Sequence, residues 1–330
     1  MSGRELVDRW TTAQGRRLAE DAAFCLVSGE SFLGSEIPIH EGRVDLRGFS
    51  LPAPERIGGI TSGRLKGKVV DGLFSFRGTT WKDLDLSFAR LESLRFFDAN
   101  VVNCVFDRVN ARDWRLWNST VESSSFQRAD LRDAGLGTWW EERSNTWDHV
   151  TFESADLRGA TFQVARLIAC DFSGSKLGSM QFSQCVLQGV KFKGVLEDMF
   201  FDSRGVGGRP DPGPMVDVDF SESTFRYVDF RGCRFESASF PNDPGLRLIP
   251  FFPKVARREI ELLDGDTSLE ARQIVAVLEN ELRMPGREDS TGVFVRDDWA
   301  RDGGEELAGL AQETLMRALQ EVGGSATPSN

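Results

Sequence analysis

The chain has 330 residues, of which 40% are hydrophobic and 28% are charged. It is long enough to bury a core without disulfide bonds, and this composition excludes a wholly disordered protein. No apolar run approaches the ~20 residues that cross a bilayer, and the charged N-terminus does not resemble a signal peptide, so we expect a cytoplasmic protein that binds no membrane. The net charge of -11 argues against direct binding to nucleic acid.

Residues 1–73 are predicted to form an N-terminal capping region. An amphipathic helix near Thr12–Ser28 would carry Leu18, Ala22 and Cys25 on one side. It is followed by the isolated unit Val44-Asp45-Leu46-Arg47-Gly48, a single copy of the pattern that dominates the next segment. We expect this unit to begin the first coil of the structure described next.

A five-residue repeat dominates residues 74–240. Phe or Leu recurs at every fifth position from Phe152 to Phe192, with a small or modest apolar residue two positions before each, and runs in two other frames bring the total to twenty-seven repeats. A period of five fits neither an α-helix nor a flat strand, because it places successive repeats on different faces of both. A chain that turns a corner about every five residues can point all of them toward a common axis, so an all-β solenoid is predicted.

The alternation of Phe and Leu constrains the number of sides of this solenoid. An even number of sides stacks Phe152, Phe172 and Phe192 on one another, whereas three sides would stack Phe on Leu. Four sides of five residues give a 20-residue coil. Nearly seven such coils, at ~4.8 Å each, make a rod roughly 33 Å long.

Three stretches match a known motif closely. Ala129-Asp130-Leu131-Arg132-Asp133, Ala155-Asp156-Leu157-Arg158-Gly159 and Cys170-Asp171-Phe172-Ser173-Gly174 resemble the A(D/N)LXX motif of the pentapeptide-repeat family. The resemblance covers about residues 74–240, half of the chain. It implies a right-handed, quadrilateral β-helix; the spacing itself supports four sides and says nothing about the hand.

Two stretches break the five-residue frame and are predicted to be loop insertions in the rod. The first is 137–149, with Trp139, Trp140 and Trp147, and the second is 197–214, which is rich in Gly and Pro. Loops on a rigid scaffold often carry function. The second is equally well explained as a plain connector.

Residues 241–330 are predicted to form a C-terminal helical region with a disordered tail from Gly323. One helix follows a cap at Thr267 and Ser268, and a second spans 304–322. One helix is enough to close the end of the rod. The apolar stripe of the second is therefore expected to bind another copy of the chain and form a homodimer.

An outward-facing set of aromatic residues is the first candidate for a binding surface. Phe97 and Trp117 each follow a central residue and are separated by one predicted coil, so they belong to the same outer wall, and the next coil runs into Trp139 and Trp140. Such a strip is either covered by the N-terminal segment or a C-terminal helix of the same chain, or it binds a partner.

The cysteines and histidines do not form a pattern typical of catalysis or metal binding. Cys104, Cys170, Cys185 and Cys233 fall on the small inward position, which predicts core residues. His40 and His149 have no companions at useful spacing and are read as surface or loop residues. We therefore expect no enzyme, no cofactor and no metal.

Two functions remain. The broad prediction is a non-catalytic protein-binding scaffold that acts through the outer surface of its β-helix. The alternative comes from the resemblance, because the quinolone-resistance members of the family resemble B-DNA in charge and bind DNA gyrase in its place, which protects against topoisomerase poisons. The carboxylates that could replace phosphates lie near the C-terminal end of the rod: Asp202, Asp211, Asp217, Asp219, Glu222, Asp229 and Glu236.

Overall fold

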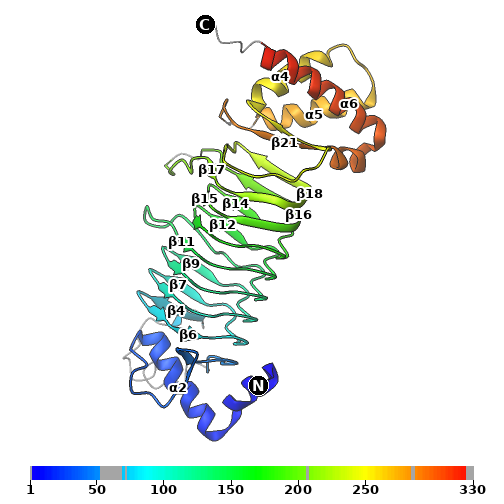
Figure 1. Cartoon of the computed structure of the whole chain (residues 1–330). Helices are drawn as coiled ribbons and strands as arrows, with labels where there is room; N and C mark the ends of the chain where they lie inside the picture. Colours follow the sequence, from blue (N-terminus) through cyan, green and yellow to red (C-terminus); the bar gives the residue numbers. More distant parts are fainter. Residues whose placement is uncertain (1, 53–68, 71–72, 206–207, 284–286, 325–330) are drawn as a thin grey trace.

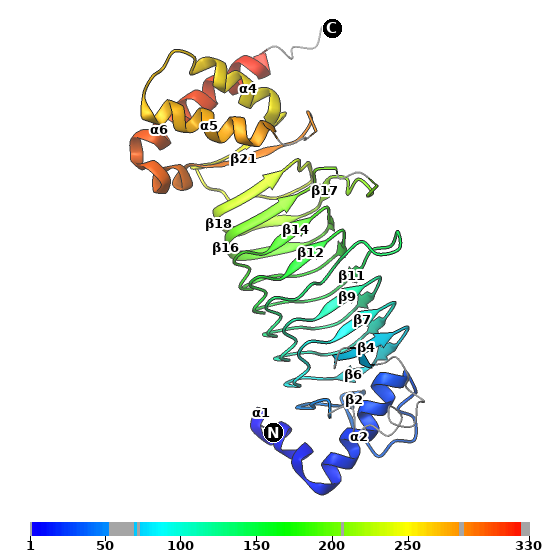
Figure 2. The ribbon, with the colours of Figure 1, turned by 180° about the vertical axis from the view of Figure 1, so that it is seen from behind.

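The computed structural model describes residues 2–52, 69–70, 73–205, 208–283 and 287–324. The middle of the molecule is a rod of stacked coils (Figure 1). Helices lie at both ends of the rod, the N-terminal ones at one end and the C-terminal ones at the other, as the view from behind also shows (Figure 2).

The rod is built from short parallel strands that stack coil upon coil. One wall contains β4 (Leu73–Arg77), β7 (Arg95–Phe97), β9 (Arg115–Trp117), β12 (Thr161–Gln163), β14 (Gln181–Ser183), β16 (Lys191–Asp202) and β18 (Asp219–Arg231), with β3 (Val69–Val70) antiparallel to β4. The next wall contains β5 (Thr80–Lys82), β8 (Asn100–Val102), β10 (Thr120–Glu122), β11 (Thr146–Asp148), β13 (Arg166–Ile168), β15 (Val186–Gln188), β17 (Met215–Val216) and β19 (Phe235–Glu236).

Two further columns of single parallel bridges run along the rod, one through Asp85 and Val105 and one through Arg90 and Asn110. Backbone pairing therefore falls in four columns. Where no residue is inserted, each residue pairs with the one that stands four repeats later, as Phe96 does with Leu116. The structure is a β-helix solenoid with parallel sheets, as the repeat predicts.

The corners of the coils explain the period of five. At one corner the carbonyl of Leu86 accepts a hydrogen bond from the amide of Ala89 at 3.0 Å, and Phe88 has a φ of 61°. A positive φ at the third residue is the mark of a type II turn. The same position two residues after a central residue is occupied by Gly159 (φ 72°) and Gly174 (φ 67°), which adopt this conformation without a steric penalty.

Phenylalanine rings stack in columns inside the rod, as the sequence predicts. Phe152 lies over Phe172 at 4.8 Å between ring centroids and 10° between ring planes, and Phe172 lies over Phe192 at 5.2 Å and 9°. A second column, in which Phe162 stacks on Phe182 at 5.4 Å, meets the first edge to face. All these rings are buried.

The N-terminal end of the rod is closed by helix α2 (Ala13–Ser28), which is preceded by α1 (Gly3–Asp8) and the 3-10 helix η1 (Arg9–Thr11). The predicted helix is confirmed, but its buried face is centred on Ala22, Ala23 and Leu26, while Leu18 and Cys25 are half-buried.

The isolated repeat at Val44–Gly48 also begins the first coil. Strand β2 (Arg43–Asp45) pairs with β1 (Ile39–His40) on one side and, in parallel, with β6 (Leu84–Asp85) on the other. Leu46 is fully buried.

The C-terminal end of the rod is closed by an antiparallel strand pair that the sequence analysis missed, β20 (Leu246–Ile249) and β21 (Gly292–Val295). The amide of Thr291 donates a hydrogen bond of 2.7 Å to the carbonyl of Cys233 in the last coil. Leu246 and Val295 join the core of the rod. Three helices pack beyond this pair: α4 (Phe252–Leu262), α5 (Leu269–Arg283) and α6 (Arg296–Gly324).

The predicted loop insertions are longer than the real ones. Trp147 belongs to β11 and is fully buried, because it is the central residue of its repeat and pairs with Val121 of the preceding coil. Because this coil has extra residues, the five-residue frame after it is shifted relative to the frame before it. Likewise, residues 197–202 belong to β16, where Phe201 pairs with Phe182 after a coil that is slightly shorter than the regular one.

The apolar stripe of the last helix has a partner within the chain. Leu307, Ala311 and Leu315 of α6 are buried in a second core together with Val255 of α4 and Ile274 of α5. The reason for expecting a homodimer through this helix is therefore wrong, since the stripe is already covered. Residues 325–330 of the predicted tail lie outside the described residues. Within the described residues, no helix is both long and apolar enough to span a membrane.

Candidate functional site

Phe97 and Trp117, two residues of the predicted aromatic strip, lie on the outer wall formed by β4, β7 and β9. The rings of Phe97 and Trp117 stack face to face, with 4.4 Å between centroids and 4° between planes. The guanidinium of Arg77, one coil earlier, lies 4.1 Å from the centroid of the Phe97 ring. A cation at that distance over an aromatic face is attracted by the ring quadrupole. We call Arg77, Phe97, Trp117 and Trp140 the aromatic strip.

Trp140 reaches the strip from the first loop. Its amide and carbonyl pair with those of Arg143 at 3.0 and 2.9 Å, and Glu141 and Glu142 between them have φ values of 48° and 61°. Two positive φ values make this a tight hairpin turn of type I′. The Trp140 ring meets Phe97 edge to face at 6.3 Å and remains 40% exposed.

An ion pair also ties this loop to the wall. A guanidinium nitrogen of Arg143 lies 3.7 Å from a carboxylate oxygen of Asp98, which also accepts a hydrogen bond from the side-chain amide of Asn118. Within the described residues, the strip is therefore partly covered by its own loop, and not by the N-terminal segment or the C-terminal helix that one of the two predicted alternatives named. Trp139 is half-buried, and Trp147 belongs to the core.

Arg77 and Arg143 were missed by the sequence analysis. Arg77 stands one regular coil before Phe97, so the coil length could have found it. Arg143 could not be found this way, because the conformation of its loop does not follow the repeat.

The predicted acidic residues do not form one continuous stripe. Asp219 and Glu222 lie in the first half of β18, whereas Asp229 lies near its end, beside Phe200 of β16. Asp217 has a φ of 51° and occupies a corner just before β18. Glu236 belongs to β19 on a further wall, so the candidates are spread over several walls and a corner of the rod.

Most of these carboxylates have a basic neighbour. Arg204 binds both carboxylate oxygens of Asp202, at 2.9 and 2.6 Å, and Arg231 binds Asp229 at 2.6 Å. Lys193 pairs with Glu222, and Asp211 pairs with Arg287 at 3.0 Å and Arg234 at 3.4 Å. The hydrogen bond from Ser221 holds the pKa of Asp219 below its usual range. Much of the negative charge at this end of the rod is therefore balanced locally.

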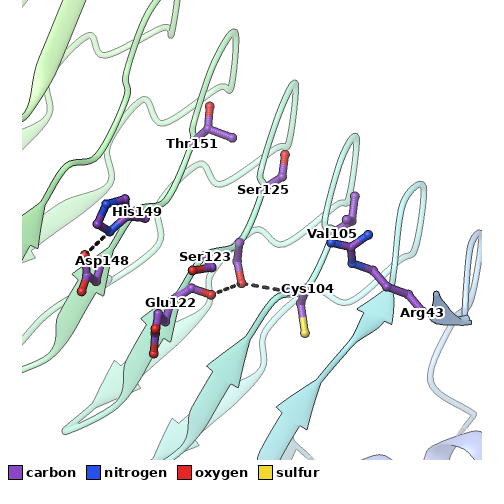
Figure 3. A pocket seen from close by; sticks show the side chains of 10 residues that line it. Arg43, Cys104, Val105, Glu122, Ser123, Ser125, Asp148, His149 and Thr151 are labelled. Carbon is purple, nitrogen blue, oxygen red and sulfur yellow. Dashed lines mark hydrogen bonds and ion pairs between the residues drawn. The ribbon is translucent and has the colours of Figure 1, made fainter. Parts of the chain in front are cut away.

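An open groove of about 550 Å³ runs along one corner of the rod (Figure 3). Hydroxyl groups of Ser123, Ser125 and Thr151 line it, and the exposed His149 ring bonds the carboxylate of Asp148 at 2.6 Å. His149 is thus on the surface, as expected. Among the described residues, no three His, Cys, Asp or Glu side chains are grouped to hold a metal ion.

The inward cysteines are core residues, as predicted. Cys104, Cys170, Cys185 and Cys233 are buried, and burial raises the pKa of each thiol to about 12. A thiol that stays protonated at neutral pH is a poor nucleophile and metal ligand.

A family model for pentapeptide repeats matches residues 146–174, 165–195 and 215–242, with 8 copies. The chain carries pentapeptide repeats. Their strands, inward Phe and Leu columns and corner residues are those described above, and the structure extends the same coils to residues on the N-terminal side of the matched ranges. No curated protein matches the sequence.

Several solved structures are similar to the pentapeptide-repeat rod. A trypsin-treated variant of QnrB1, a plasmid-mediated fluoroquinolone resistance protein, is 15% identical; the match covers 51% of this chain and 83% of that one, with a TM-score of 0.28. HetL, involved in heterocyst differentiation regulation in the cyanobacterium Nostoc, is 15% identical over 56% of this chain and 92% of that one, with a TM-score of 0.20.

Proposed function

We propose that this protein is a non-catalytic cytoplasmic scaffold that binds another protein through the outer surface of its β-helix, with the aromatic strip as the contact. In this proposal an N-terminal cap (1–73) and a C-terminal helical region (241–330) flank the rod (74–240). The rod is a right-handed quadrilateral β-helix. The four columns of backbone pairing support the four sides, and the family resemblance supports the hand.

The observation that carries the proposal is the strip itself. Trp and Arg are enriched among the residues that dominate binding energy at protein interfaces. Trp in particular buries a large area with little loss of side-chain freedom, because its rigid ring has only two side-chain torsions. Here Arg77, Phe97 and Trp117 stand on consecutive coils of a rigid rod, and Trp140 joins them from a loop. Such a surface is held in place before a partner arrives, which lowers the entropic cost of binding.

The test compares two double variants of the full chain. Phe97→Ala with Trp117→Ala removes the strip, and Val102→Ala with Ile168→Ala truncates two half-buried residues at the equivalent outward position of the neighbouring wall. Proteins captured from cytoplasm by wild type are identified by mass spectrometry, and the partner is then purified and titrated against each chain.

We expect the strip variant to bind this partner at least tenfold more weakly than wild type, and the control variant to bind it normally. Circular dichroism melts show whether both variants are folded. Equal affinity for wild type and the strip variant would overturn the proposal, as would equal loss in both variants.

The alternative function, replacement of DNA on gyrase, requires free carboxylates where phosphates would sit. Its support is the -4 net charge over residues 197–240. The ion pairs at Asp202, Glu222 and Asp229 weaken it, because paired carboxylates offer less charge to a partner. An assay of gyrase supercoiling separates the two functions. Inhibition that is lost on changing Asp219, Glu222 and Asp229 to Lys, but kept in the strip variant, would establish the alternative.

A further inference from the structure

A cavity of about 420 Å³ lies between the last coils of the rod and the C-terminal helices. Its walls come from β16 and β18 on one side and from β21, α4, α5 and α6 on the other. Figure 2 shows β21 and the three helices lying beyond β16 and β18 at the C-terminal end of the rod. A volume of this size is within the range of pockets that hold small molecules.

Aromatic and aliphatic side chains form much of the wall. Phe200 and Phe230 contribute from the rod, and Phe252, Phe294 and Trp299 contribute from the C-terminal region. Phe294 and Trp299 stack on each other, with 6.3 Å between centroids and 22° between planes. Tyr227 and Val277 also line the cavity and are 41% and 43% exposed, so the cavity opens to solvent beside them.

The charged side chains that line the cavity are mostly acidic. Five carboxylates line the cavity against a single guanidinium, that of Arg231, which is already bound to Asp229. Asp298 accepts a hydrogen bond from the backbone amide of Tyr227 and pairs with Arg301. Glu281 forms no hydrogen bond or ion pair with any described residue.

The carboxylates also lie in an environment that disfavours their charge. Burial, and then the charge of Asp229, raises the pKa of Glu281, although Arg231 and Arg204 act in the opposite direction. Burial raises the pKa of Asp229 and of Asp298 as well. A cation that entered the cavity would relieve this cost, and because the site is partly desolvated its attraction to the carboxylates would be stronger than in water.

A metal ion does not fit this arrangement. Carboxylate ligands of a metal must converge on one point, but the part of the chain that the structure describes contains no such group of three His, Cys, Asp or Glu residues. Carboxylates distributed around aromatic walls instead suit an organic cation, whose apolar body contacts the rings while its charge meets an acidic side chain.

We propose that this cavity binds a small organic cation, an ammonium group carried on an aromatic or aliphatic body, with Glu281 as the partner of the charge. The apolar body lies against Phe294 and Trp299. The site is separate from the aromatic strip, which belongs to β4, β7 and β9 near the other end of the rod.

Isothermal titration calorimetry on the full chain at pH 7.5 tests this with two probes of the same shape, 4-phenylbutylamine and the neutral 4-phenylbutan-1-ol. We expect the amine to bind at least tenfold more tightly than the alcohol. Glu281→Gln should weaken the amine at least tenfold and leave the alcohol unchanged. Glu279→Gln, two positions away on α5 and absent from the lining, should change neither.

Val277→Trp, which fills the open side of the cavity, locates the site independently of charge. We expect it to abolish binding of the amine, with a melting curve that shows a folded chain. Equal affinity for amine and alcohol would refute the role of the carboxylates. Amine binding that survives both Glu281→Gln and Val277→Trp would place the site elsewhere, and no heat with millimolar amine would overturn the proposal altogether.

Discussion

Removing the ring of Phe162 should strongly destabilise the rod. The ring is fully buried, stacks on Phe182 at 5.4 Å, and meets Trp147, Phe152 and Phe172 edge to face at 5.6, 6.2 and 6.1 Å. Phe-to-Ala changes in cores cost about 3–5 kcal/mol, and the cost rises when the neighbours cannot close the cavity. Here each neighbouring ring is fixed by the coil on its own level, so we expect about 4–5 kcal/mol for Phe162→Ala.

Urea denaturation followed by tryptophan fluorescence measures this loss, with Trp147 as a nearby reporter. Because solenoids can unfold repeat by repeat, hydrogen exchange of the β12 amides should be measured alongside. The matched control is Arg158→Ala. Its side chain is 53% exposed and, among the described residues, pairs only with Asp156, so the change should shift the midpoint little. Equal midpoints for the two variants would refute the inward assignment of Phe162.

Two further outcomes follow from buried titratable groups. Burial raises the pKa of Glu259 to about 7, so between pH 4.5 and 7 the folded chain holds a proton that the unfolded chain has released. The free energy of unfolding should therefore fall as the pH rises through this window, by at most about 3 kcal/mol. Glu259→Gln should remove this contribution, which urea titrations at pH 5 and pH 8 will measure. Iodoacetamide at pH 8 should label Cys25 alone in the folded chain and all five cysteines in denaturant, and mass spectrometry will measure the labelling. Labelling of Cys185 in the folded chain would contradict its place in the core.

The interior of the rod could be predicted from sequence because the residues that determine the conformation of a repeat lie within that repeat. A central Phe or Leu, a small residue two positions earlier and a corner residue with positive φ all lie within one repeat, so the pattern is local. The prediction failed where the length of a coil changes. The coil before Trp147 is longer than 20 residues and the coil before Phe201 is shorter. Both shift the five-residue frame along the sequence, while Trp147 and Phe201 still stack in the same columns as the central residues of the preceding coils.

The two ends of the rod were less predictable because their contacts join distant parts of the chain. Strands β20 and β21 are short and separated by two helices, so neither carries a local signal of its partner. The hydroxyl of Tyr227 donates a hydrogen bond of 3.0 Å to Asp302, which is far away in sequence. The cavity near this contact is lined from several elements, and no spacing rule in the sequence brings them together.

The difference between the regular repeats and the irregular segments also determines where a binding site can form. The inward positions are constrained by stacking, and the outward positions of a regular coil are limited to one side chain per site on a nearly flat wall. The open groove at the Ser123 corner is what such walls and corners offer, and a more enclosed site requires a departure from the repeat. This chain departs from it at the Trp140 hairpin, which folds over the aromatic strip, and at the C-terminal helices, which enclose the cavity. The repeat supplies rigidity, and the two irregular segments supply shape, so variants that separate binding from stability should be sought in those segments.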